Sequence, residues 1–182
     1  GLSDELKKLN ALLNSLLELA QISRDRNILL EKVRIDEIVF DSIHQVKSRY
    51  PGRRIIPKIQ YPENNNDLLV RGNEGLLSMA FRNLIDNACK FSDDDVIVEF
   101  SIAEKSIRIT VSDSGIGIPR KDLDNVYKPF SRASNTKFIG GYGIGLSLVS
   151  RVMELHNAKL KLESVESRGT TRSEEHTSEL QS

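Results

Sequence analysis

Two neighbouring segments in which apolar and polar residues alternate constrain the fold of this chain most strongly. Residues 96–103 and 106–112 show the period of two that a half-buried strand requires, with Glu104 and Lys105 between them. They predict an antiparallel β-hairpin with one face on a hydrophobic core. A strong helix predicted over residues 73–91, which Asn73 caps, comes directly before the hairpin. Its apolar stripe can therefore pack on the hairpin.

The other predicted elements alternate irregularly between helix and strand. Strands are predicted over 33–35, 54–61, 68–71 and 159–164, and helices over 36–49 (with Asp36 as its cap), 119–127 and 144–156. Residues 128–141 show little periodicity and predict a mobile loop. The order is mixed and lacks a regular βαβ repeat. It predicts an α/β fold with helices layered on one face of a mixed, mainly antiparallel sheet.

Leucines and other apolar residues recur at every third or fourth position over residues 2–22 and predict an amphipathic helix. A helix so rich in leucine needs a partner. Two interpretations remain open: the helix packs on its own domain, or it is half of a helical hairpin that pairs with another chain. Its place at the start of the chain, before the charged loop 23–27, favours the second.

The composition excludes several classes of protein. Lysines plus arginines equal aspartates plus glutamates at 26 each, so no overall field attracts nucleic acid or an anionic membrane. Cys89 is the only cysteine, which rules out an internal disulfide and favours a reducing compartment. No apolar run approaches the roughly 20 residues that a membrane span requires. We therefore expect a cytoplasmic, soluble piece of a protein.

Three polar residues of the predicted helix 73–91 form the first candidate site. Asn83, Asn87 and Lys90 are spaced by four and three residues, which places them on one face. Neutral oxygen donors beside an ammonium suit Mg²⁺ and phosphate together, because Mg²⁺ prefers hard oxygen ligands and shares its shell with phosphates. Taken alone, these asparagines are more simply read as surface residues.

Two glycine-containing segments form the second and third candidate sites. Asp113 ends a predicted strand and can accept a hydrogen bond from an adenine amine, while Gly115 and Gly117 allow close approach to a flat base. Alone, this is a common turn. Residues 140–147 are glycine-rich and open a helix, whose free amides favour phosphate oxygens. The spacing fits neither GxxxxGK[ST] nor GxGxxG. The glycines could be hinges only, but with residues 128–139 they predict a lid.

The order of these segments resembles the catalytic ATP-binding domain of sensor histidine kinases, and more broadly the superfamily shared with gyrase, Hsp90 and MutL. NLIDNACKFS is similar to its N box, DSGIGIP to its G1 box, YKPFSRAS to its F box and GGYGIGLSLV to its G2 box. The resemblance covers residues 30–171. It implies a two-layer α/β sandwich of the Bergerat type, with ATP held between the asparagine helix and the lid.

The resemblance also implies a role for each residue on the asparagine helix and beyond. Asn87 would coordinate Mg²⁺, and Asn83 would support the phosphates and a metal-bound water. Lys90 would contact phosphate, Phe91 would pack against adenine, and Asp113 would bind the adenine amine. Asn83 stands where the ATP-hydrolysing members carry a glutamate that activates water. Because an amide cannot accept that proton, the resemblance implies a kinase that keeps ATP intact until an imidazole arrives.

The lid residues have implied roles of the same kind. Phe130 would anchor the lid, and Arg132 would reach the γ-phosphate and act with Asn83 and Lys90 on the transferred group. The remaining implied contacts are residues that shape the adenine wall and the phosphate channel: Gly115, Gly117, Gly141, Gly143, Gly145 and Leu146.

The ends of the chain depart from the family pattern. Residues 1–25, with LLNSLLELAQIS, look like the second helix of the dimerisation hairpin. The first helix, with the phosphoacceptor histidine, is missing, and His44, His156 and His176 are read as structural or surface residues. The chain should therefore bind ATP without phosphorylating itself. The implied partners are its own hairpin, a second kinase subunit in a homodimer and a response-regulator receiver domain. Nucleic acid is not among them, and any membrane anchor would lie upstream.

The last segment, residues 172–182, reads RSEEHTSELQS and shows no strand alternation. It resembles the translation of a sequencing adapter and is interpreted as a non-native tail. On this interpretation the sheet lacks an edge strand. The underlying nucleotide sequence would test this.

Two further classes of protein share part of this pattern. A serine kinase of the anti-sigma type belongs to the same superfamily, but the leucine-rich helix at the front argues against it. A degenerate, non-enzymatic nucleotide-binding module is disfavoured by the intact Asn87, Asp113 and loop glycines.

Overall fold

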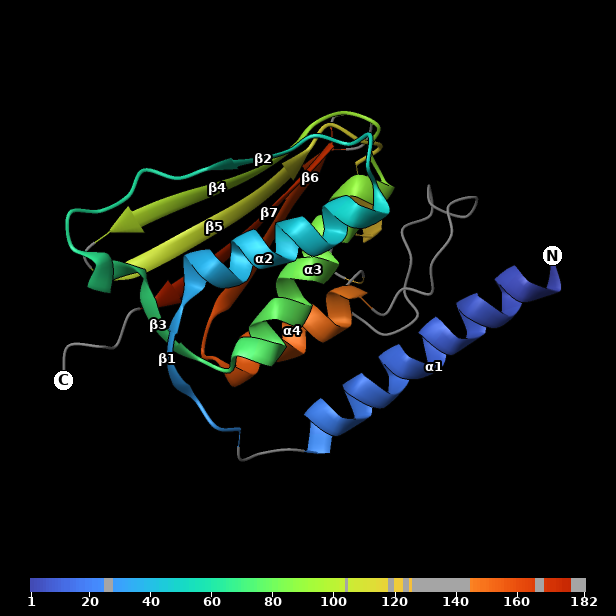
Figure 1. The fold of residues 1–182 in the computed structure, drawn as a ribbon, viewed down its shortest axis with the longest axis horizontal. Coiled ribbons are helices and arrows are strands. Elements are labelled where there is room, and N and C mark those ends of the chain that lie inside the picture. Colours follow the sequence, from blue (N-terminus) through green and yellow to red (C-terminus); the bar gives the residue numbers. More distant parts are fainter. Residues whose placement is uncertain are drawn as a thin grey trace.

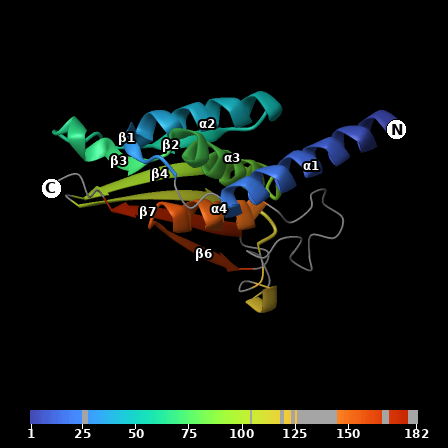
Figure 2. The same cartoon turned by 90° about the horizontal axis from the view of Figure 1, so that it is seen from below.

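Three helices of the chain cover one face of a five-stranded sheet, and a fourth helix extends away from this body (Figure 1). The computed structural model describes residues 1–24, 28–103, 105–117, 120–122, 125, 145–165 and 169–177. A single cluster of buried apolar side chains fills the space between the helices and the sheet. The view in Figure 2, turned by 90°, shows the helical layer lying on the sheet. This arrangement confirms the predicted two-layer α/β fold.

The large sheet is mixed and mainly antiparallel, as predicted. Its order is β2 (Ile55–Lys58), β4 (Val96–Ala103), β5 (Ser106–Asp113), β7 (Gly169–Thr177) and β6 (Lys159–Val165). Only the β2–β4 pair is parallel. The predicted hairpin is confirmed by the register of β4 and β5, in which Ala103 lies opposite Ser106. A second, two-stranded sheet joins β1 (Glu31–Arg34) and β3 (Leu69–Gly72).

The helices are α1 (Leu2–Arg24), α2 (Ile35–Arg49), α3 (Glu74–Lys90) and α4 (Gly145–Leu155), with short 3₁₀ turns at Asn65–Leu68 and Arg120–Asp122. Helix α3 lies at the centre of the helical layer and contacts both α2 and α4. It begins where the sequence predicts, because the Asn73 Oδ1 accepts a hydrogen bond from the Leu76 amide at 3.1 Å. Its buried stripe faces the sheet: Leu77, Phe81, Leu84 and Ala88.

Some predicted local details are wrong. Asp36 does not cap α2, because the N-cap is Arg34 and Asp36 lies inside the first turn. The buried Asp36 carboxylate instead accepts two hydrogen bonds from the Arg34 guanidinium, at 2.9 and 2.8 Å. Strand β2 is shorter than the predicted 54–61. Of the helix predicted over 119–127, a 3₁₀ turn at Arg120–Asp122 is described, and the predicted loop 128–141 lies outside the described residues.

The expectation that the sheet lacks an edge strand, because residues 172–182 show no strand alternation, is also wrong. Strand β7 continues to Thr177 and lies inside the sheet, with β5 on one side and β6 on the other. The missed strand has a physical explanation. Its main-chain groups pair with β5 and β6, which are distant in the sequence, and the residue pattern of 172–177 alone does not report such pairing.

Helix α1 confirms the predicted amphipathic helix, but its leucine stripe is left uncovered by the described residues. Five of its leucines are 53–76% exposed: Leu2, Leu6, Leu9, Leu13 and Leu17. Among the α1 side chains that the structure describes, Leu16 packs against the core, and the helix contacts α4. None of the described helices combines the length and the hydropathy that a membrane span needs.

Candidate functional site

The first turn of α4 faces the two asparagines of α3. A Cβ placed on Gly145 would lie 3.1 Å from the Asn83 Oδ1 and 3.5 Å from the Asn87 Nδ2. Both asparagines are half-buried, on the edge of α3 opposite its core stripe. The structure therefore brings together one residue of the predicted glycine loop and two residues of the predicted asparagine helix. The absence of a side chain at Gly145 leaves a small cradle beside two amides.

The two amides differ in their surroundings. The Asn83 Nδ2 donates to the Met79 carbonyl at 2.9 Å, which orients the Asn83 Oδ1 toward Gly145. For the Asn87 side chain, no hydrogen bond is found among the described residues. A neutral amide oxygen can accept hydrogen bonds or bind a hard cation, but it cannot act as a general base.

The end of α3 carries Lys90 and Phe91. Both are half-buried, and the Lys90 Nζ lies 5.5 Å from the centre of the Phe91 ring, within the range of a cation–π contact. Phe91 is the C-cap of the helix, and its amide donates to the Asn87 carbonyl at 3.1 Å. A lysine in the last turn is favourable to the helix dipole. This end thus presents one cation and one aromatic ring side by side.

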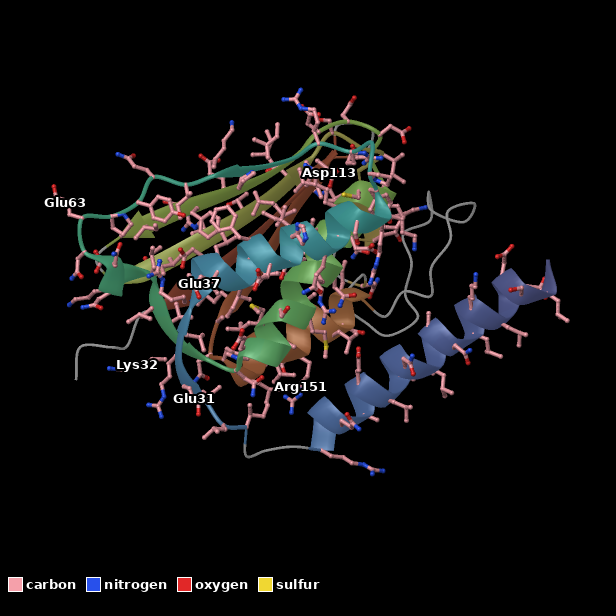
Figure 3. The ribbon with its side chains drawn as sticks, in the orientation of Figure 1. Glu31, Lys32, Glu37, Glu63, Asp113 and Arg151 are labelled. Atoms are coloured by element: carbon pink, nitrogen blue, oxygen red, sulfur yellow. The ribbon has the colours of Figure 1, made fainter. Side chains whose placement is uncertain are left out.

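The turn after β5 is tied directly to the end of α3. Asp113, the buried last residue of β5, accepts a hydrogen bond on its Oδ1 from the Gly115 amide at 2.9 Å (Asp113 is labelled in Figure 3). The Ile116 amide donates to the Phe91 carbonyl at 3.2 Å. A Cβ on Gly115 would lie 1.9 Å from that same carbonyl oxygen, so only glycine permits this approach. Gly117 has a φ of 71°, which also favours glycine.

The structure thus brings the predicted site residues together in two groups. Asn83, Asn87 and Gly145 meet between α3 and α4, with Leu146 half-buried beside Gly145. The end of α3 meets the Asp113 turn. The remaining predicted site residues lie outside the described part of the chain: Phe130, Arg132, Gly141 and Gly143.

Arg53, which the sequence did not mark as a site residue, contacts the end of α3. The Arg53 Nη1 donates to the Cys89 carbonyl at 2.9 Å and also to the Ser92 carbonyl. Burial raises the pKa of the Cys89 thiol to about 11, although the nearby Arg53 charge acts in the opposite direction. The thiol is therefore neutral at pH 7. Arg53 stands in an irregular segment after Pro51 and Gly52, where no periodic pattern marks it.

His156 and His44, the two histidines whose side chains the structure describes, lie outside this site. The His156 Nε2 accepts a hydrogen bond from the Asn73 amide at 3.0 Å, while its Nδ1 lies 2.7 Å from the Val152 carbonyl and so carries the proton. His156 therefore links the end of α4 to the start of α3, which confirms its interpretation as a structural residue. His44 is exposed on α2.

Comparison with known proteins identifies relatives along most of the chain. The sensor histidine kinase WalK of Bacillus subtilis (strain 168) is 29% identical over 180 residues, which cover 92% of this chain and 28% of WalK. The sensor-like histidine kinase SenX3 of Mycolicibacterium smegmatis is 31% identical over 172 residues, or 92% of this chain and 44% of SenX3. The chain thus spans less than half the length of either relative.

A solved structure shares the fold. Full-length ShkA in complex with AMPPNP matches with a TM-score of 0.78 at 22% identity, over 93% of this chain and 36% of that chain. The family model described as histidine kinase-, DNA gyrase B- and HSP90-like ATPase matches residues 72–174, which is more than half of the sequence. The chain therefore belongs to the family of histidine kinase-, DNA gyrase B- and HSP90-like ATPases.

Proposed function

We propose that this chain is the ATP-binding catalytic part of a two-component sensor histidine kinase. It would transfer the γ-phosphoryl group of ATP to a histidine on the dimerisation hairpin, for relay to a response-regulator aspartate. The observation that carries this proposal is the pairing of Asn83 and Asn87 across from Gly145. The side-chain amides of Asn83 and Asn87 can bind phosphate and a metal ion, but the Asn83 amide cannot accept a proton from water. Both curated relatives described above are named as sensor histidine kinases, which supports the same class.

The proposed position of the nucleotide follows from the two groups of site residues, one between α3 and α4 and one at the Asp113 turn. Adenine would lie against Phe91 and the Asp113 turn, where the Asp113 carboxylate can accept a hydrogen bond from the exocyclic amine. The phosphates would extend toward Lys90, Asn83 and the N-terminal end of α4, where free amides and the helix dipole favour anions. ShkA was solved with AMPPNP, an ATP analogue, which supports a nucleotide in this fold. The proposed site also includes four residues of the lid: Phe130, Arg132, Gly141 and Gly143.

The residues present fit a magnesium ion that is shared with the nucleotide. The Asn87 amide lies next to the cradle that a Cβ on Gly145 would fill. Within the described residues, no three side chains of histidine, cysteine, aspartate or glutamate gather to hold a metal. A Mg²⁺ that takes one protein oxygen and completes its shell with phosphates and water is a common arrangement at nucleotide sites. Asn87 would hold the ion, which would offset the charge of the phosphates.

The partners proposed for the whole protein follow from helix α1. Its exposed leucines form a continuous apolar stripe, which suits a second helix of the same hairpin and the hairpin of a second subunit. The phosphoacceptor histidine would lie on that missing helix. A response-regulator receiver domain would then dock on the completed hairpin. A membrane anchor, if the whole protein has one, would lie in segments other than those present here.

Two measurements test the proposed function. Calorimetric titration with ATP, with and without MgCl₂, should show binding that depends on the metal; absence of metal-dependent binding would favour the degenerate module. A separately supplied hairpin that carries its histidine should then become labelled from [γ-³²P]ATP. The label should be acid-labile and alkali-stable, as phosphohistidine is. Transfer to a serine protein instead would favour the anti-sigma class of kinase.

Gly145→Ala should weaken ATP binding about tenfold without destabilising the fold. The new methyl group would lie 3.1 Å from the Asn83 Oδ1 and would occupy the cradle, whereas alanine suits a helix better than glycine does. Titration calorimetry and thermal unfolding measure the two effects separately. Gly75→Ala is the matched control, because Gly75 lies in the first turn of α3 with only an ordinary contact at 3.5 Å. Equal ATP affinity in the two variants would contradict the cradle.

A further inference from the structure

Arg53 is a largely buried arginine whose hydrogen-bond partners are main-chain carbonyls. Its side chain is 14% exposed. The Nη1 donates to the carbonyls of Cys89 and Ser92, and the guanidinium lies 6.0 Å from the centre of the Tyr50 ring. The Arg53 amide also donates to the Tyr50 carbonyl at 2.9 Å, which fixes the turn that carries the side chain. The guanidinium is therefore held in one orientation from several directions.

The carbonyls hold Arg53 more strongly than its acidic neighbour does. The Arg53 Nη2 lies 3.8 Å from an oxygen of Asp93, whose side chain is fully exposed, and an ion pair of this kind contributes little. The last carbonyls of a helix, by contrast, have no partner within the helix and carry its negative dipole end. A guanidinium satisfies such carbonyls with several N–H groups in a fixed plane. Arg53 thus caps the C-terminal end of α3.

The two capped carbonyls stand on either side of Lys90 and Phe91. The same short segment is also tied to the Asp113 turn, since the Phe91 carbonyl accepts from the Ile116 amide, while the Phe91 amide ends the helix by donating to the Asn87 carbonyl. The backbone of residues 89–92 is thereby held between Arg53 on one side and the Asp113 turn on the other. The direction in which Lys90 and Phe91 leave the helix depends on that backbone.

We propose that Arg53 is a positioning residue for the nucleotide site, which acts by holding the backbone of residues 89–92 so that Lys90 and Phe91 face the phosphates and the adenine. This inference rests on the proposed function. Among the described residues, the side-chain partners of Arg53 are Cys89, Ser92, Asp93 and Tyr50, so Arg53 itself contacts neither the cradle at Gly145 nor the Asp113 turn. Its effect on the nucleotide is therefore carried by the two residues that it brackets.

The adjacent arginine provides a matched control. Arg54 pairs with Asp95 at 3.4 Å on the surface, with its side chain 74% exposed. Arg53→Met should raise the Kd for Mg-ATP about tenfold, whereas Arg54→Met should leave it unchanged. Arg53→Lys keeps the charge but cannot reproduce the planar set of donors, so it should give an intermediate Kd with the fold retained. If Arg53→Met does not fold, Arg53→Lys alone decides: wild-type affinity in a folded Arg53→Lys protein would overturn the proposal.

A double-variant cycle separates positioning from a purely structural cap. If Arg53 acts through Lys90, then Arg53→Met should weaken ATP binding less in a Lys90→Met background than in the wild type. A structural cap predicts instead that the two factors multiply, which would overturn the proposal. Thermal unfolding without nucleotide should show the same loss for Arg53→Met in both backgrounds. Failure of the wild-type chain to bind ATP would refute the proposed function itself, and the inference about Arg53 with it.

Discussion

Replacement of Asn87 by alanine is expected to weaken Mg²⁺-dependent ATP binding strongly while the fold stays intact. Asn87 is half-buried and lies outside the apolar stripe of α3, so its removal opens no cavity in the core. Its Oδ1 would lie 3.8 Å from a Cβ on Gly145, and it is the oxygen that we propose as the metal ligand. We expect a loss of about 100-fold in affinity, which corresponds to roughly 2.8 kcal/mol. Titration calorimetry with and without MgCl₂ measures it.

Two further variants, Asn87→Asp and the control Asn66→Ala, test whether the loss of affinity is specific to the Asn87 amide. Asn87→Asp keeps the size and an oxygen but adds a negative charge beside the phosphates, so binding should also fall. Asn66→Ala removes an exposed asparagine of the 3₁₀ turn Asn65–Leu68, which contacts β3 and β4, and should leave the affinity unchanged. Circular dichroism and thermal unfolding should match the wild type in all three variants. A folded Asn87→Ala protein that binds Mg-ATP normally would refute the assignment of the metal site.

Elements that depend on near neighbours could be predicted from the sequence. The β4–β5 hairpin follows from two alternating segments and a short connection, so its pairing is local. Helix α3 follows from its apolar stripe and from the Asn73 side chain, whose hydrogen bond to the Leu76 amide spans three residues. Asp36 shows the limit of such signals. A residue that could cap a helix pairs instead with the arginine two positions before it.

Features that depend on distant residues could not be predicted from local pattern. The parallel pairing of β2 with β4 and the place of β7 inside the sheet join segments far apart in the chain. The same holds for the cradle, where Gly145 of α4 meets Asn83 and Asn87 of α3. Only the resemblance to a family predicted that these residues share a site. Neither pattern nor resemblance predicted Arg53, because a capping guanidinium in a turn has no periodic signature.

Replacement of Gly115 by alanine is expected to disturb both the fold and the adenine side of the site. The new Cβ would lie 1.9 Å from the Phe91 carbonyl oxygen and 2.7 Å from its carbon, so one of the two backbones must move. That movement would break the hydrogen bond from the Ile116 amide, which joins the Asp113 turn to the end of α3. We expect a loss of about 1–3 kcal/mol in the free energy of unfolding, as overpacking usually costs.

ATP affinity should fall in Gly115→Ala even at temperatures where the variant is fully folded, because Phe91 and Asp113 would no longer keep their relative positions. Urea unfolding and titration calorimetry measure the two losses. Gly75→Ala is again the control, since a Cβ there makes only an ordinary contact at 3.5 Å and Gly75 lies in the first turn of α3, at the other end of the helix from Phe91. If Gly115→Ala unfolds and binds ATP like Gly75→Ala, the contact between the Asp113 turn and the end of α3 does not shape the site.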